Sequence, residues 1–218
     1  MLSKIKSLIV LFAGISLMSI GIALAKLAQL GTSPISSIPN VMSYITPLSI
    51  GNLTILFMVL MIFLQMIILR EVNIPIALQI IPGVVFGWLI DVFVDVFTQI
   101  GLPSLMGHYL EQLAFTLIGM VILSFGVFLE VNSRSILMPG EGLVVALTLR
   151  TKKPFGNLKM ITDLTMVAVA LIISLVYFHD LVGIREGTIL AALFTGRRVT
   201  MYEPLIPFID RFTTKETK

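Results

Sequence analysis

Long apolar stretches alternate along the chain with short stretches that contain proline, glycine or charged residues. Six of the apolar stretches reach or approach the about 20 residues that a helix needs to cross the bilayer core. They cover residues 5–28, 52–69, 76–97, 110–130, 158–178 and 183–202. Two others, 34–48 and 139–149, are too short to span. The pattern predicts an all-α integral membrane protein with six transmembrane helices and two short broken or re-entrant helices.

Composition supports this class. Apolar residues make up 57% of the 218 residues and charged residues only 12%, about half of what a soluble domain carries. Transmembrane β-strands alternate apolar and polar residues, which these unbroken runs do not. The net charge of +3 does not indicate nucleic acid, because the basic residues stand at the predicted helix ends. The expected partners are the lipid bilayer and a small molecule, and 24.0 kDa is compatible with a homodimer.

The sequence also matches itself at an offset of 105 residues, without a gap. Between residues 12 and 60 the offset gives nine identities. Leucine matches mean little in an apolar chain, but proline, glycine and a repeated Gly-Asn-Leu triplet are informative. The matched pairs are Gly14/Gly119, Ser19/Ser124, Gly21/Gly126, Leu24/Leu129, Pro34/Pro139, Thr46/Thr151, Gly51/Gly156, Asn52/Asn157 and Leu53/Leu158. We interpret this as an internal duplication, with repeats at 1–106 and 107–218.

The distribution of lysine and arginine predicts the orientation of the two repeats. With the N-terminus in the cytoplasm and six crossings, thirteen of the 15 basic residues are cytoplasmic. Only Lys26 and Arg185 lie outside, as the positive-inside rule requires. Each repeat has three crossings, an odd number, so the second repeat is inverted relative to the first. Both termini are then cytoplasmic.

The two short helices occupy equivalent places in the inverted repeats. Such interrupted segments typically mark a binding site near the middle of the membrane. Ser33 and Pro34 are typical of a helix start, and Thr46 before Pro47 is typical of a helix end. A helix N-terminus carries free N–H groups that suit an anionic or polar ligand group. The predicted substrate-binding residues are Ser33, Pro34, Ser36, Ser37 and Asn40, with Pro139, Gly140, Glu141 and Gly142. For the serines and Asn40, hydrogen bonding to the backbone groups at the helix end is an equally weighted alternative.

Two acidic residues are candidates for a coupling role, because a carboxylate inside a membrane is costly. Glu141 has an equally weighted alternative as a hydrated residue at the cytoplasmic mouth, paired with Arg134 or Arg150. Asp163 either lies on a proton or cation path or forms an ion pair with Lys159 at i−4.

Five other polar residues fall in membrane segments. Asn52 and Asn157 are predicted to cap the helices that begin there. Gln79 is predicted to form a helix-to-helix hydrogen bond. Arg197 and Arg198 either extend to the cytoplasmic headgroups or bind an anionic substrate or lipid phosphate.

The motif Gly-x-Ser-Pro at residues 31–34, followed by Leu-Ser-x-Gly at 48–51 and a third helix marked by proline and glycine, resembles a known group. It resembles the YczE/YitT-like bacterial membrane proteins over most of residues 8–205. The resemblance implies a small, duplicated, multi-pass protein of the bacterial cytoplasmic membrane. It implies transport of an unknown substrate, and an association of the family with vitamin B6-sensing regulators implies a small polar metabolite.

The leading hypothesis is a transporter or permease for a small polar metabolite, anionic or zwitterionic, bound between the two inverted repeats. The alternatives are a substrate-binding membrane subunit that needs an energising partner, and a passive channel. We do not expect an enzyme, a cofactor or a metal site. The chain has no cysteine, two histidines in predicted loops and no catalytic motif.

Overall fold

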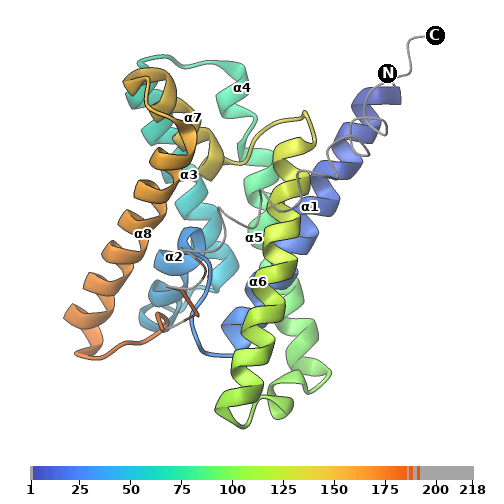
Figure 1. Cartoon of the computed structure of the whole chain (residues 1–218), viewed down its shortest axis with the longest axis vertical. Coiled ribbons are helices and arrows are strands. Elements are labelled where there is room, and N and C mark those ends of the chain that lie inside the picture. Colours follow the sequence, from blue (N-terminus) through green and yellow to red (C-terminus); the bar gives the residue numbers. More distant parts are fainter. Residues whose placement is uncertain (1, 186, 189–190, 192–218) are drawn as a thin grey trace.

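The fold was examined in a computed structural model, which describes residues 2–185, 187–188 and 191 (Figure 1). All regular structure in this part of the chain is helical. The long helices are α1 (Leu2–Leu27), α3 (Ile50–Leu69), α5 (Ile80–Gln99), α6 (Tyr109–Asn132) and α8 (Phe155–Phe178). The short ones are α2 (Pro34–Ile45), α4 (Ile74–Ala77), α7 (Pro139–Thr151) and the 3-10 helix η1 (Leu102–Leu105).

Five helical stretches are long and apolar enough to cross a membrane. They are Lys4–Leu27, Ile50–Leu69, Ile74–Gln99, Tyr109–Asn132 and Phe155–Phe178. The prediction of an all-α fold with several apolar helices of membrane-spanning length is confirmed for the described residues. The sixth predicted helix, 183–202, falls largely outside the described residues.

The two short helices form where the sequence predicts them. Helix α2 begins after Ser33, which has extended backbone angles, and it ends at Thr46. Helix α7 begins after Met138 and ends at Lys152, which adopts a left-handed conformation. Each has proline as its first residue. With 12 and 13 residues the helices are about 18 and 20 Å long, so neither can cross a bilayer core of about 30 Å alone.

Among the described helices, α1 and α6 form the most extensive helix pair. A Cβ on Gly14 would lie 2.8 Å from the backbone oxygen of Gly126, and one on Gly21 would lie 2.5 Å from that of Gly119. Such distances are too short for any side chain, so glycine is needed for this packing. Close backbone contact through small residues is how membrane helices associate where water supplies no hydrophobic force.

The remaining helices pack crosswise around this pair. Helix α5 lies against both α1 and α3. On the other side of α3, α2 packs against α8 and α7 packs against α3 (Figure 1). Each short helix therefore contacts a long helix from the other half of the chain.

The third membrane stretch is not the single helix predicted for residues 76–97. It is divided into α4 and α5 by Leu78 and Gln79. Pro82 has no N–H to donate to the carbonyl of Leu78, four residues earlier. The N–H of Ile81 donates to that carbonyl instead, at 3.2 Å. The break turns the Gln79 side chain inward.

The prediction that Asn52 and Asn157 cap their helices is wrong. Helix α3 starts at Ile50, and its cap is Ser49, whose hydroxyl accepts a hydrogen bond from the Asn52 N–H at 3.0 Å. Helix α8 starts directly after Pro154. Both asparagines lie within the first turn, with exposed side chains.

Candidate functional site

The first residues of α2 and α7 meet inside the protein. We call residues 33–36 and 138–141 the tips of these helices. The Ile35 side chain fills the space beside Gly140, where any added Cβ would overlap Ile35 Cδ1. Pro139 also lies close to α5, since a Cβ on Gly83 would be 3.5 Å from its ring. The tips come from different halves of the chain and meet at one place. This is the arrangement expected of two short helices that face a common site.

The tip of α2 carries two buried hydroxyl groups that lack a hydrogen-bond partner among the described residues. Ser33 and Ser36 are 4% and 0% exposed. Neither hydroxyl has a hydrogen-bond partner among the residues that the structure describes. Although Ser33 is the N-cap of α2, its side chain makes no capping bond. Buried polar groups are nearly always hydrogen-bonded, so these two hydroxyls are available to a ligand.

Two other predicted residues of α2 already have partners. The Ser37 hydroxyl donates to the Pro34 carbonyl at 2.6 Å. Asn40 accepts a bond from Lys26 Nζ at 3.2 Å and donates to the Gly183 carbonyl at 2.8 Å. Their hydrogen-bonding groups therefore hold the surrounding structure together.

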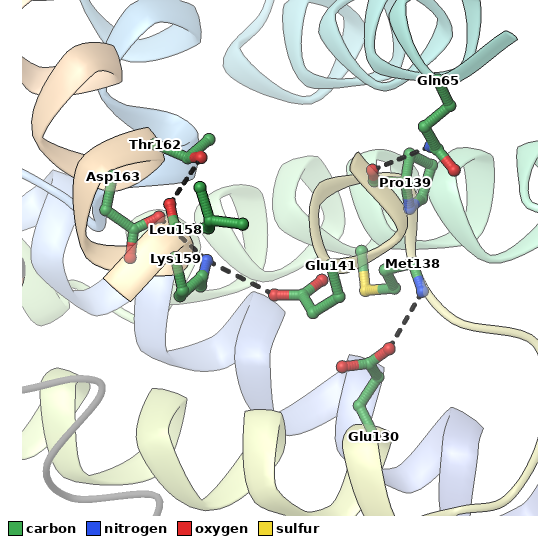
Figure 2. Close-up of polar contacts among 9 residues, drawn as sticks. All are labelled: Gln65, Glu130, Met138, Pro139, Glu141, Leu158, Lys159, Thr162 and Asp163. Atoms are coloured by element: carbon green, nitrogen blue, oxygen red, sulfur yellow. Dashed lines mark hydrogen bonds and ion pairs between the residues drawn. The ribbon is translucent and has the colours of Figure 1, made fainter. Parts of the chain in front are cut away.

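The tip of α7 carries a buried carboxylate. Glu141 is 4% exposed, so its placement at a hydrated mouth is wrong. Its Oε1 lies 3.6 Å from Lys159 Nζ of α8, whereas Oε2 has no hydrogen-bond partner in the described part of the chain. Figure 2 shows the two side chains pointing toward each other. As the third residue of α7, Glu141 also lies where the helix dipole favours negative charge.

Asp163 shares the same lysine. Its Oδ1 lies 2.8 Å from Lys159 Nζ, one turn away on α8, and Asp163 is 5% exposed. The predicted i−4 ion pair is therefore confirmed.

Glu130 is a site residue that the sequence did not reveal. It stands in the last turn of α6 and is 1% exposed. Its Oε1 accepts a hydrogen bond from the Met138 N–H at 2.9 Å, directly at the tip of α7 (Figure 2). Its Oε2 has no hydrogen-bond partner within the described residues. Its position at the end of an apolar run resembles an ordinary helix terminus at the membrane surface, which is why it was missed.

Two glutamines hold the tip of α7 from the other side. Gln65 of α3 donates from Nε2 to the Pro139 carbonyl at 3.0 Å and to Gln79 Oε1 at 2.9 Å. The second bond is the helix-to-helix contact predicted for Gln79. A Cβ on Gly142 would lie 2.6 Å from both glutamine oxygens, so only glycine lets them approach α7. Gln65 was not singled out in the sequence, where it stands alone in an apolar run.

Four ionisable groups thus form one buried charge cluster at the tip of α7: Glu130, Glu141, Lys159 and Asp163. With every group ionised, three carboxylates face one ammonium group, a formal charge of −2. A buried charge is stable only when it is paired. The cluster can therefore bind a proton, a cation or the positive part of a ligand.

Comparison with protein families gives one match. The model of a family of unknown function, DUF6198, matches residues 5–204. The chain belongs to the DUF6198 family. Comparisons with curated proteins and with solved structures found no significant match. In this DUF6198 chain the match covers both tips and the whole charge cluster.

Two other predicted residues of the DUF6198 chain, Asn52 and Asn157, are not buried at the tips. The side chains of Asn52 and Asn157 are exposed. Arg197 and Arg198 lie outside the described residues. The structure thus brings the two tips into contact at Ile35 and Gly140 and leaves the side chains of the asparagines exposed.

Proposed function

We propose that the chain is a multi-pass transporter of the bacterial cytoplasmic membrane, with both termini in the cytoplasm. Its substrate would be a small zwitterionic metabolite, held between the tips of α2 and α7. The observation that carries this proposal is the meeting of the two tips, Ile35 against Gly140, with unpartnered buried polar atoms beside the contact. We also propose that DUF6198 and the YczE/YitT-like proteins are related, on the Gly-x-Ser-Pro motif at the first tip.

The proposed architecture is six transmembrane helices in two inverted repeats. In a two-fold arrangement, when residue i contacts the copy of j, residue j contacts the copy of i. The glycines of α1 and α6 satisfy this rule at the offset of 105: Gly14 faces Gly126, the equivalent of Gly21, and Gly21 faces Gly119, the equivalent of Gly14. The crosswise packing of α2 on α8 and of α7 on α3 satisfies it as well.

The chemistry of the two tips supports a zwitterion rather than a simple anion. The N-terminus of α2, with the Ser33 and Ser36 hydroxyls, suits an acidic group. The tip of α7 carries Glu141 and adjoins Glu130, and the charge cluster has an excess of negative charge that would repel an anion. An ammonium group there would restore the balance and satisfy the free carboxylate oxygens.

The proposed transport cycle follows from the two repeats. Binding sites at the midplane of inverted repeats open to one side at a time when one repeat rocks against the other. Contacts between the repeats at the tips, such as Ile35 with Gly140, would have to part for the ligand to leave. The short helices would then move with their own repeats.

The test is counterflow of a labelled substrate in proteoliposomes. A thermal-shift screen of amino acids and other zwitterions would first identify a binder, because a ligand at 100 times its Kd adds about 2.7 kcal/mol to the stability of the folded state. Removing one hydrogen bond to a charged ligand group costs about 1.5–3 kcal/mol, so Ser36→Ala should weaken binding at least about tenfold.

Ser124→Ala is the matched control for this variant. Ser124 is also buried, at 1% exposure, but its hydroxyl donates to the Met120 carbonyl of its own helix at 2.6 Å. Binding should be unchanged in this variant. The proposal fails when no binder shows counterflow, or when both alanine variants weaken binding equally.

A further inference from the structure

One carboxyl group of the buried charge cluster forms no ion pair with a cation of the described residues. Lys159 lies 2.8 Å from Asp163 and 3.6 Å from Glu141, so its single positive charge is shared between these two residues. Glu130 has no ion-pair partner among the described residues. Within that part of the chain, the hydrogen bond of its side chain is the one that Oε1 accepts from the Met138 N–H. Its Oε2 is buried and has no hydrogen-bond partner there.

Charged groups on two neighbouring helices act on Glu130. Glu141 on α7 carries a charge of the same sign, and among the described residues Lys159 on α8 is the cation of the cluster. Helix α1, which packs along α6, brings Gly14 against the backbone of Glu130. The lysines of α1 stand toward its ends, at residues 4, 6 and 26. Glu130 also lies in the last turn of α6, where the helix dipole opposes a negative charge.

Glu141 and Asp163 each lie within ion-pair distance of a cation. Each has Lys159 beside it, and Glu141 is in the first turn of α7, where the dipole favours a carboxylate. The three acids are therefore not equivalent. Glu130 is the acid that has no ion-pair partner among the described residues and that lies at the unfavourable end of its own helix dipole.

We infer that Glu130 is the proton-binding residue of the site, carrying a proton on Oε2 and exchanging it with water. Protonation forms one O–H bond on Oε2, and the proton comes from water. Oε1 then remains as the carbonyl oxygen and keeps its hydrogen bond from Met138. Release returns the proton to water and leaves a carboxylate that can bind the positive group of a ligand beside Glu141. A role of this proton in transport rests on the proposed function. Proton binding at Glu130 is independent of it.

The experiment is infrared difference spectroscopy of the purified full-length protein in lipid nanodiscs, between acidic and alkaline buffer. A protonated carboxyl group absorbs apart from a carboxylate, and its band shifts in heavy water. We expect such a band in the wild-type protein, and its loss in Glu130→Gln. Asp91→Asn is the control, since it removes a half-buried carboxylate outside the cluster, one that accepts hydrogen bonds from the Ser49 hydroxyl and the Gly51 N–H, and it should keep the band.

Each other outcome overturns the inference. These outcomes are the absence of the band at every pH, its persistence in Glu130→Gln, and its loss in Asp91→Asn alone. Replacement of the band by a carboxylate signal when sodium is added at constant pH would show a metal-cation site instead. Circular dichroism checks that each variant is folded. If Glu130→Gln does not fold, Glu130→Asp should move the band, and an unmoved band would refute the assignment. A protein that shows this band but no counterflow would refute transport and leave proton binding intact.

Discussion

The contact between the two tips can be tested with two very small substitutions. Gly140→Ala adds one Cβ, which would overlap Ile35 Cδ1 but would lie 3.4 Å from Ile35 Cγ1. Carbon atoms prefer a separation of about 3.5–4.0 Å, so only the terminal methyl group of Ile35 is in the way. Ile35→Val removes that methyl group. The two substitutions should therefore compensate each other.

The expected size of this compensation follows from core packing. Forcing an extra carbon into a packed site costs about 1–3 kcal/mol, and Ile35→Val alone should cost about 0.5–1.5 kcal/mol. Alanine also favours a helix over glycine by up to about 1 kcal/mol, but this gain is present with Ile35 and with Val alike. It cancels in the double-mutant cycle. We expect a coupling of about 1–2 kcal/mol, or roughly 2–8 °C in Tm.

The assay is thermal unfolding of the four proteins of the cycle in detergent, followed by circular dichroism. Gly156→Ala is the control, because a Cβ there meets nothing within 4 Å, and its effect should be the same with Ile35 and with Val. The reasoning is refuted when the effects of Gly140→Ala and Ile35→Val simply add, within about 0.5 kcal/mol. Additive effects would mean that the two tips do not touch at these residues.

Three further outcomes are expected. Lys159→Met removes the cation that the described part of the chain places beside Glu141, which should cost about 3–5 kcal/mol of stability. The loss should be smaller in acidic buffer, where protonation removes the unpaired negative charge, and an unchanged Tm would contradict this. Single cysteines in place of Leu48 and Lys153, exposed equivalents at the offset of 105, should react with a membrane-impermeant reagent from opposite sides, whereas reaction from one side would exclude inverted repeats. Glu130→Gln should lose uptake driven by a pH gradient, and retained gradient-driven uptake would rule out this residue as the coupling group.

Helix positions were predictable from the sequence because their signals are local. Apolar runs end at charged residues or at proline, so α1, α3, α6 and α8 begin and end within a few residues of the predicted limits. The starts of α2 and α7 are set by Ser33-Pro34 and Met138-Pro139, which need no tertiary context. The break before α5 was missed because it depends on Pro82, whose effect falls on a carbonyl four residues away.

The candidate site was predictable only in part, because its chemistry arises from the packing of distant segments. Glu141 stood out as an acid within an interrupted helix. Glu130 did not, because it becomes part of the site only when the following loop folds back and brings the Met138 N–H to its side chain. Asn52 was wrongly predicted as a cap because the helix starts earlier, and its backbone N–H donates to the hydroxyl of Ser49. Sequence position alone does not tell whether Ser49 or Asn52 is the cap.

The unequal pair Ile35 and Gly140 bears on how such a protein could evolve. Under the proposed duplication, an ancestor made of two identical halves would carry the same residue at both tips. Two isoleucines would overlap there, and two glycines would leave a cavity. The present contact needs a large side chain at one tip and a glycine at the other, and two identical halves cannot provide both. Covalent fusion of the two copies would have allowed the two tips to acquire different residues. From then on, neither half could replace the other.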